Sequence, residues 1–451
     1  GPERIETLRS VAATARRGRT SFEALDLGPA DALLGPLADA RAEIDEALTE
    51  ALEGLDRTAT MSDGLAVFFE GPNDYLLLAA NNAQMQNGQG MFLSAGMLHV
   101  EDGRMDLGSM ESLEKVPEVA PPIPLEPDLA ARWGWLDPNE DIRHLGLTHR
   151  FGVTAETAAA LWPALGNPEV DGVVVVDPHV LEAIMHATGP ILTPQGERRA
   201  EDVLAFILHD QYQGYLTDGE DTSYTDVRRD ELDDIARTVL EEFESITDLD
   251  ADFLDRFRAA ASGRHLLRWA ADPTVQAGFE AAGVDGQITP DSLLLSLVNR
   301  SGVKLDWFME MAADLSVERV GDVYEAELEI AITNEAPTSG EPRYVVGPYP
   351  GSGLDEGDYL GLVTLNLPEG ATNSRFDGVE PLAVSGPDGA NRTIAAWVRV
   401  PRGTTTTVVA RFELPGSTEE LLVEPSARTN PTEWSFGRKD WKDKERRTLA
   451  L

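Results

Sequence analysis

The hydrophobic pattern of this 451-residue chain changes its period near residue 313, and this change constrains the fold more than any other feature. Before that point, continuous apolar runs such as 75–80 and 173–176 alternate with segments of helical period. Beyond it, apolar residues recur at every second position. Continuous apolar runs are typical of strands buried on both faces, and alternation is typical of strands with one solvated face. We therefore expect an α/β sheet flanked by helices, followed by an antiparallel β-sandwich.

Turn residues divide the chain further. Gly28-Pro29 interrupts an amphipathic helical pattern, which predicts an N-terminal helical hairpin over 3–57. The α/β domain with a helical extension is expected over 58–312, and the sandwich over 313–437. Residues 438–451 form a basic tail.

Charge and composition exclude several classes of protein. The chain has 37 basic and 79 acidic residues, a net charge of −42, so a nucleic acid partner is not expected. Without cysteine it has neither disulfides nor a thiolate metal site. The sequence contains no run of about 20 apolar residues, which is the length needed to span a bilayer. The seven histidines have no partner at i+4, so a histidine-based zinc site is not predicted.

An amide-rich loop follows the first buried strand and is the first candidate site. It begins with Asn81 and Asn82 and includes Gln84 and Gln86. Ligands of open α/β sheets bind at the carboxyl ends of strands. The alternative is a polar turn that only reverses the chain.

Clustered arginines form the other candidates, because the guanidinium fork suits phosphate. Arg143 and Arg150 follow a Pro- and Trp-containing segment, and Arg228 and Arg229 open a helix beginning near Asp226. Cations are disfavoured at a helix N-terminus, which is why a bound anion is plausible there. The alternative is ion pairing with the many carboxylates. If the four arginines serve one site, they should converge near Asn81.

The order of these motifs resembles the LytR–CpsA–Psr fold over about 70–245. The resemblance is carried by the run 75–82, the turn 101–104, the strand–helix unit 170–190 and the Asp226-x-Arg-Arg helix start. More closely, most of the chain resembles the actinobacterial "domain of unknown function 4012" proteins. That likeness rests on Asn-Asn-Ala at 81–83, Val-Asp-Pro at 176–178 and Lys-Leu-Asp-Trp at 304–307.

This resemblance implies a membrane-anchored extracytoplasmic phosphotransferase. Such enzymes move glycopolymers from a polyprenyl-pyrophosphate carrier to the cell wall with the aid of Mg²⁺, so we expect a membrane anchor that this sequence does not include. The resemblance implies catalytic roles for three residues: Asn82, Asp177 and Asp226. Together with the motifs above it implies a ligand-binding set of eight: Asn81, Gln84, Gln86, Arg143, Arg150, Tyr212, Arg228 and Arg229.

A non-catalytic protein is the alternative. Where the related proteins carry Glu-x-Arg, this chain has Gln84-Met-Gln86, and Asn87–Gly90 replaces an Arg-Ser-Asp segment. A site with amides in place of charges would bind pyrophosphate more weakly. The alternative is therefore an envelope assembly or glycan-binding protein with a degenerate site, which contacts an envelope glycan or other envelope proteins. A glycan hydrolase is a weaker third reading, because no catalytic carboxylate pair is identifiable.

Overall fold

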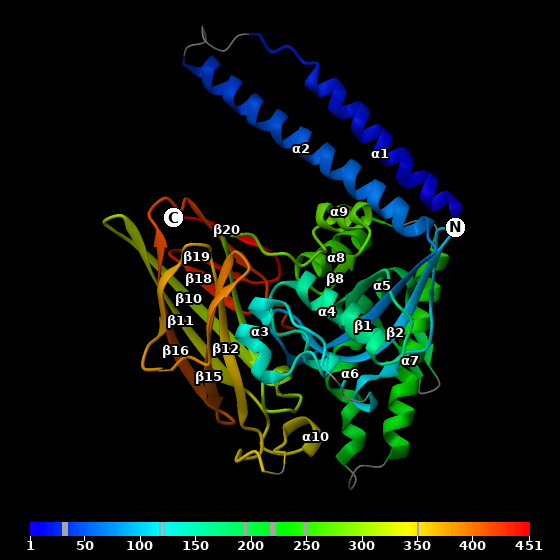
Figure 1. The fold of residues 1–451 in the computed structure, drawn as a ribbon, viewed down its shortest axis with the longest axis vertical. Helices are drawn as coiled ribbons and strands as arrows, with labels where there is room; N and C mark the ends of the chain where they lie inside the picture. Colours follow the sequence, from blue (N-terminus) through cyan, green and yellow to red (C-terminus); the bar gives the residue numbers. More distant parts are fainter. Residues whose placement is uncertain are drawn as a thin grey trace.

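The computed structural model describes residues 1–28, 35–116, 119–120, 122–193, 196–216, 222–246, 250–349, 351–379 and 381–451. It shows a mixed α/β domain, a β-sandwich beside it, and an N-terminal helical pair that projects away from both (Figure 1). The predicted mixed α/β class with N-terminal helices is confirmed at this level. No described helix is long and apolar enough to cross a membrane.

The N-terminal hairpin consists of α1 (Pro2–Glu23) and α2 (Pro36–Glu70). A proline in the first turn of each helix suits that position, because it needs no hydrogen-bond donor there. The second helix continues well beyond residue 57, where the sequence pattern placed its end, and stops at Gly71 with a positive φ. Its last turns belong to the body of the protein, because Phe68 is buried in the same core as Tyr75.

Two glycines allow α2 to dock closely on α9 (Pro273–Ala282). A Cβ atom on Gly64 would lie 2.5 Å from Cα of Gly278 and 2.8 Å from the carbonyl oxygen of Thr274. Real Cβ atoms do not approach backbone so closely. The hairpin is therefore held at a helix crossing that only glycine permits.

We expect Gly64→Ala to lower the free energy of unfolding by about 1–3 kcal/mol, because the added methyl must push the two helices apart. Gly54→Ala is the matched control on the same helix, since a Cβ there meets nothing within 4 Å. Removing an interior helical glycine should leave stability unchanged or raise it by up to about 1 kcal/mol. Urea denaturation followed by circular dichroism measures both, and equal stabilities would contradict this account of the crossing.

A mixed sheet forms the centre of the α/β domain. Its strand order is β3-β2-β1-β5-β8, with β4 paired to β2. The long strands β1 and β2 form an antiparallel hairpin, β1 and β5 are parallel, and β8 is antiparallel to β5. The strands are β1 (Asn73–Met85), β2 (Gly90–Glu101), β3 (Arg104–Leu107), β4 (Glu111–Ser112), β5 (Gly172–Val176) and β8 (Leu266–Ala270).

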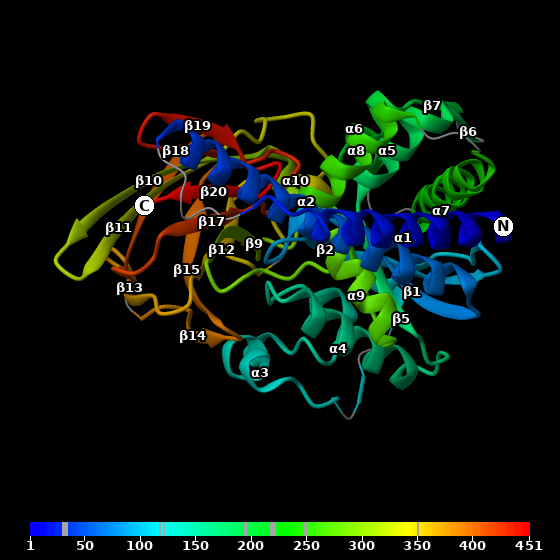
Figure 2. The same ribbon diagram turned by 90° about the horizontal axis from the view of Figure 1, so that it is seen from above.

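Helices cover both faces of this sheet, as the continuous apolar runs predict. In Figure 2, α4 lies on one side of the sheet and α5 to α8 lie on the other. Leu76 and Leu78 belong to the core that includes α4, whereas Tyr75 and Leu77 belong to the core that includes α5 to α8. The helices are α4 (Phe151–Ala164), α5 (Pro178–Thr188), α6 (Ala200–Leu208), α7 (Thr222–Ser245) and α8 (Ala251–Ser262). Smaller elements are α3 (Pro127–Trp133), β6 (Ile191–Thr193) and β7 (Gly196–Arg198).

The sandwich consists of two six-stranded sheets, ordered β13-β16-β11-β10-β18-β19 and β14-β15-β12-β9-β17-β20. The expectation of a purely antiparallel sandwich is wrong, because β10 pairs with β18 and β9 with β17 in parallel. The two strands of each of these pairs are far apart in the sequence. The local alternation of apolar residues does not reveal whether such distant strands run parallel or antiparallel. The strands are β9 (Ser292–Asn299), β10 (Met309–Val320), β11 (Val323–Asn334), β12 (Tyr359–Leu367), β13 (Thr372–Phe376), β14 (Val384–Asp388), β15 (Asn391–Val400), β16 (Thr405–Pro415), β17 (Glu420–Glu424), β18 (Glu433–Phe436), β19 (Lys439–Lys442) and β20 (Arg447–Ala450).

The sandwich extends beyond 313–437 at both ends. Strand β9 precedes residue 313, and β19 and β20 lie within the segment assigned as a basic tail. A short helix, α10 (Arg343–Val346), lies between β11 and β12.

A buried carboxylate joins the two domains. Asp306 accepts hydrogen bonds from the backbone N–H of Met85 at 3.0 Å and from Nδ2 of Asn299 at 2.6 Å. The hydroxyl of Tyr359 donates to it at 3.2 Å, and Arg428 forms an ion pair with it at 3.5 Å. The end of β1 is therefore fixed to the sandwich, which determines where the loop after β1 can lie.

Candidate functional site

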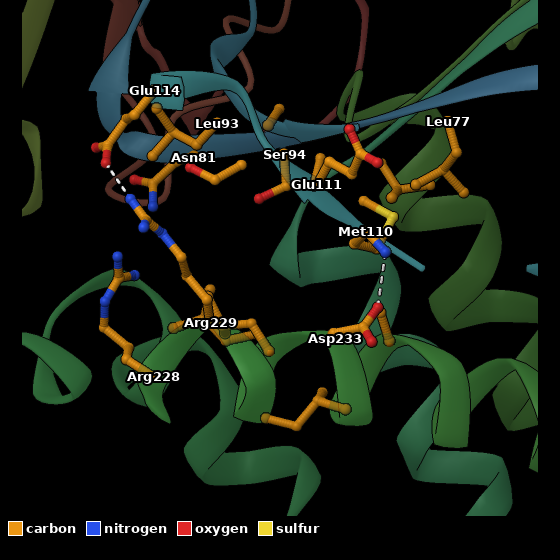
Figure 3. A pocket seen from close by; sticks show the side chains of 18 of the residues that line it. Leu77, Asn81, Leu93, Ser94, Met110, Glu111, Glu114, Arg228, Arg229 and Asp233 are labelled. Atoms are coloured by element: carbon orange, nitrogen blue, oxygen red, sulfur yellow. Dashed lines mark hydrogen bonds and ion pairs between the residues drawn. The ribbon is translucent and has the colours of Figure 1, made fainter. Parts of the chain in front are cut away.

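The candidate site is a cavity of 670 Å³ (Figure 3). It lies between α7 and the face of the sheet that α5 to α8 cover. Strands β1, β2 and β5, the segment around β4, and the helices α5, α6 and α7 all contribute to its wall. Its lining includes Leu77, Asn81, Leu93, Ser94, Met110, Glu111, Glu114, Val176, Asp177, Leu181, Gln211, Tyr212, Arg228, Arg229, Leu232, Asp233, Ile235 and Tyr344.

Two arginines of α7 form a cationic end of the cavity. Figure 3 shows both guanidinium groups directed from α7 toward Asn81 and Glu114 on the opposite wall. Arg229 pairs with Glu114 at 2.6 Å, and Nη1 of Arg228 donates to Oε1 of Gln211 at 3.0 Å. Arg228 is only 9% exposed, so its charge is largely removed from water.

Tyr212 connects these arginines to the end of β1. Its hydroxyl accepts a hydrogen bond from Nδ2 of Asn81 at 3.1 Å, and the guanidinium of Arg228 lies 5.2 Å from the centre of its ring. A cation over an aromatic face is attracted by the negative charge of that face. Asn81, Tyr212 and Arg228 therefore form one contiguous polar wall.

A buried lysine from the sandwich side lies behind this wall. The ammonium of Lys304 donates to Oε1 of Gln84 and lies 5.4 Å from the ring centre of Tyr212 and 5.9 Å from that of Tyr344. Burial lowers the pKa of Lys304 to about 7, and the charge of Arg228 acts in the same direction, while Glu114 opposes it. Its charge therefore changes near neutral pH.

The carboxylate of Glu114 is held ionised by these cations. Burial alone would raise its pKa, but the charges of Lys304, Arg229 and Arg228 outweigh burial and place the pKa below the ordinary value. The cationic end thus contains three basic groups around one carboxylate. An anion entering here would meet fixed N–H donors and would compete with Glu114 for Arg229.

Two carboxylates, Glu111 and Asp233, lie at the end of the cavity away from the arginines, and the remaining lining is a mixture of apolar and polar side chains. Leu77 and Met110 lie at that end in Figure 3, close to Glu111 and Asp233. The backbone N–H of Met110 donates to Oδ1 of Asp233 at 2.8 Å. The arginines therefore lie at one end of the cavity and the carboxylates of Glu111 and Asp233 at the other, and leucine, isoleucine and valine side chains contribute to the lining.

Asp177 forms a second polar cluster where β5 meets α5. It is the N-cap of α5, and its Oδ1 accepts from the backbone N–H of His179 at 2.9 Å. Its Oδ2 accepts from Nδ2 of Asn82 at 2.7 Å and lies 2.6 Å from Nδ1 of His265. Burial would raise the pKa of Asp177, but the two imidazoles hold it well below its usual range.

Several residues predicted from the sequence do come together. Asn81, Asp177, Tyr212, Arg228 and Arg229 line one cavity. Gln84 lies behind them as the acceptor for Lys304, and Asn82 supports Asp177. The side chain of Asp226 lies outside the described residues.

The predicted convergence of four arginines is wrong for two of them. Arg143 pairs with Asp141 beside it in sequence, and Arg150 pairs with Asp388 of β14 at 2.6 Å and with Glu126 at 2.8 Å. Both form the ion pairs that were the alternative interpretation.

Gln86 does not line the cavity either. It is completely buried, and β1 carries it past the end of the sheet toward the sandwich. Its neighbour Asn87 donates to the carbonyl oxygen of Leu147 at 3.1 Å and accepts from Thr364 of β12 at 3.2 Å. This end of the amide-rich loop therefore joins two domains.

Lys304, Glu114 and the histidines around Asp177 were not predicted as site residues. Lys304 belongs to the Lys-Leu-Asp-Trp segment, but nothing local indicates that it lies beside residues 84 and 212. His179 and His265 are far apart in the sequence, so a search for neighbouring ligands could not pair them. Only the pairing of β5 with β8 brings them together.

The described donors do not fit Mg²⁺, which prefers an octahedron of hard oxygen ligands. Among the described residues, one group of three metal-ligand side chains lies close enough to share an ion, and two of its members are histidines: Asp177, His179 and His265. Glu114 is engaged by Arg229, and Asp233 by the backbone of residue 110. No part of the function proposed below therefore depends on Mg²⁺.

A family model matches part of the chain. Residues 70–212 match the family model described as "Protein of unknown function (DUF4012)", which confirms that resemblance for these residues. The match spans β1 to α6 and ends at Tyr212 in the cavity wall, so the arginines of α7 and the sandwich lie outside it. No curated protein matches the chain.

Proposed function

We propose that this protein acts in the cell envelope by binding a polyprenyl-pyrophosphate glycan carrier, with the pyrophosphate at the cationic end of the cavity. The observation that carries the proposal is the polarity of the cavity. Arg228 and Arg229 line one end, with the buried Lys304 behind the wall, and leucine, isoleucine and valine side chains contribute much of the remaining lining. A ligand with an anionic group and a hydrocarbon part would match these two features of the lining.

The headgroup end supports this chemistry through its donors. Guanidinium forks bind phosphate oxygens through paired, charge-assisted hydrogen bonds. Arg228 is held against Gln211 and Tyr212, so little side-chain entropy remains to be lost on binding. Asn81 adds a neutral amide close by.

The apolar part supports a prenyl chain and a single orientation for it. Five apolar residues contribute to the lining: Leu77, Leu93, Val176, Leu181 and Ile235. The carboxylates of Glu111 and Asp233 would repel a phosphate at the far end, so the headgroup is directed to the arginines. We propose that this binding takes place at the extracytoplasmic face of a membrane, where the bilayer holds the carrier.

Carrier binding could serve glycopolymer transfer to the cell wall, as in the family that the sequence resembles. A second candidate is a protein that holds the carrier or its glycan without chemistry, as part of an envelope assembly. Two contacts favour this candidate: Glu114 is engaged by Arg229, and Asp177 accepts hydrogen bonds from several donors. Neither carboxylate is placed to take a proton from an acceptor hydroxyl. We therefore propose binding of the carrier as the function.

Calorimetry with geranylgeranyl pyrophosphate tests the binding proposal. We expect it to bind more tightly than inorganic pyrophosphate, which lacks the chain, and than geranylgeraniol in detergent, which lacks the charge. Binding no tighter than that of either fragment would contradict the proposal. Incubation with a lipid-linked oligosaccharide and isolated cell wall then separates the candidates, because only a transferase attaches labelled glycan to the wall.

Lys304 should make this binding depend on pH. With a pKa of about 7, the ammonium is charged below that pH and neutral above it. Binding of geranylgeranyl pyrophosphate should therefore weaken as the pH rises from 6 to 8.5, beyond the change caused by ionisation of the ligand. Lys304→Met should show only the ligand's own pH dependence, and identical profiles for the two proteins would show that Lys304 does not act on the site.

A further inference from the structure

Two histidines that the proposed function does not use face the same carboxylate. The rings of His179 and His265 are stacked with their centres 3.8 Å apart and their planes 19° from parallel. Nδ1 of His265 lies 2.6 Å from Oδ2 of Asp177, and Nδ1 of His179 lies 3.3 Å from Oδ1. One ligand atom from each of the three residues lies within 4.8 Å of the others.

We propose that Asp177, His179 and His265 bind a divalent transition-metal ion, with Zn²⁺ as the reference ion. Two imidazole nitrogens and one carboxylate oxygen are a donor set that zinc accepts and that Mg²⁺ does not prefer. Each imidazole would bind through Nδ1 and carry its proton on Nε2. The proposal differs from the expectation, drawn from the absence of i+4 histidine pairs, that the chain has no histidine-based zinc site.

The three residues can share an ion once the two stacked rings turn relative to each other, because an imidazole binds a metal in the plane of its own ring. Ligand atoms of a tetrahedral zinc site lie about 3.3 Å apart, given metal–ligand bonds of about 2.0–2.2 Å. Nδ1 of His179 lies 3.3 Å from Oδ1 of Asp177, which is already this length, and Nδ1 of His265 lies 2.6 Å from Oδ2, the other oxygen of the same carboxylate. Rotation of one ring out of the stack would bring its Nδ1 lone pair to the same ion and lengthen the 2.6 Å contact.

The elements around the cluster are rigid, which favours a site over a chance contact. Asp177 is fixed as the N-cap of α5, and β8 begins directly after His265. Nδ2 of Asn82 donates both to Asp177 and to the carbonyl oxygen of Ala427, each at 2.7 Å. A hydrogen bond that orients a ligating carboxylate from behind is a common feature of metal sites.

The cluster also lies where an ion could meet a ligand. Asp177 and Pro178 contribute to the wall of the cavity. Three protein ligands leave a coordination position for water or for an oxygen of a bound anion. The proposal itself does not need that anion, since it concerns the ion alone.

Calorimetry with ZnCl₂ on the untagged full chain, first stripped with chelator, tests the proposal. We expect one equivalent of Zn²⁺ to bind, and MgCl₂ at the same concentrations to produce no saturable heat. His179→Ala and His265→Ala should each weaken zinc binding by at least about tenfold. His186→Ala is the matched control, because His186 is an exposed residue of the same helix α5 and should leave the affinity unchanged.

Circular dichroism and thermal unfolding without metal establish that each variant folds. If a histidine variant fails to fold, Co²⁺ titration of the unaltered chain provides a second measurement. Visible absorption of four- or five-coordinate cobalt supports the site, and the weak absorption of hexa-aquo cobalt contradicts it. The absence of stoichiometric zinc binding, or equal loss in all three alanine variants, would overturn the proposal. If Zn²⁺ does not bind but geranylgeranyl pyrophosphate does, the zinc site is excluded and the proposed function stands. If Zn²⁺ binds but geranylgeranyl pyrophosphate does not, the proposed function is excluded and the zinc site stands.

Discussion

Arg228→Ala should weaken the binding of geranylgeranyl pyrophosphate by about tenfold to a hundredfold. A hydrogen bond to a charged group contributes about 1.5–3 kcal/mol, and Arg228 is 9% exposed, so water cannot replace it well. Arg229→Ala should have a smaller effect, because Glu114 already neutralises part of the charge of Arg229 at 2.6 Å. Calorimetry of the two variants beside the unaltered protein gives both ratios.

Arg258→Ala provides the matched control for this pair. Arg258 lies on α8, outside the cavity, and pairs with Asp255 on an exposed surface. Its removal changes the net charge of the protein by the same amount as the other two substitutions, so it reports the long-range electrostatic effect alone. If all three variants lose affinity equally, the arginines of α7 act through the overall charge and the headgroup assignment fails.

Asp306→Ala should lower the free energy of unfolding by about 3–5 kcal/mol, the cost of removing one partner of a buried ion pair. Burial raises the pKa of Asp306 above its ordinary value, although Arg428 and the hydrogen-bond donors around it oppose this. The pair is therefore costly to bury, but an alanine would leave Arg428, the N–H of Met85 and Asn299 facing an empty space. Denaturant unfolding measured at two wavelengths reports the loss and shows whether the domains still unfold together.

Two further variants serve as comparisons for the loss of stability in Asp306→Ala. Asp306→Asn keeps an oxygen acceptor and removes the charge, so it should be intermediate. Glu310→Ala, at an exposed position of β10, should change stability by less than about 0.5 kcal/mol. If Asp306→Ala is as stable as Glu310→Ala, the carboxylate does not join the domains in the way that its contacts indicate.

The amide-rich loop illustrates why sequence reasoning located only part of the site. Its residue types predicted a polar crevice after the first strand, and Asn81 does line the cavity. Five residues later, Gln86 is completely buried toward the sandwich. Both side chains are neutral amides with the same local chemistry. Their surroundings differ because the sandwich, which lies more than two hundred residues later in the sequence, packs against the end of the loop that contains Gln86.

The arginines show the same division. All four fitted phosphate by residue type, and ion pairing was the alternative for each pair. The structure assigns Arg143 and Arg150 to ion pairs with Asp141 and Asp388, and directs Arg228 and Arg229 into the cavity. A carboxylate partner such as Asp388 lies in a different domain, so its pairing with Arg150 follows from domain packing and leaves no signal near either residue.

The change of hydrophobic period near residue 313, together with the apolar runs before it, was sufficient to determine a helix-covered sheet followed by a sandwich. Period and apolar content record which faces are buried, and burial is a local property of each element. Only the tertiary structure decided three other features. These are the parallel direction of the β10–β18 and β9–β17 pairs, the contacts at Asp306 that join the domains, and the proximity of His179, His265 and Asp177. Each of these depends on contacts between distant segments, whose geometry is fixed when the whole chain packs, and no local pattern contains it.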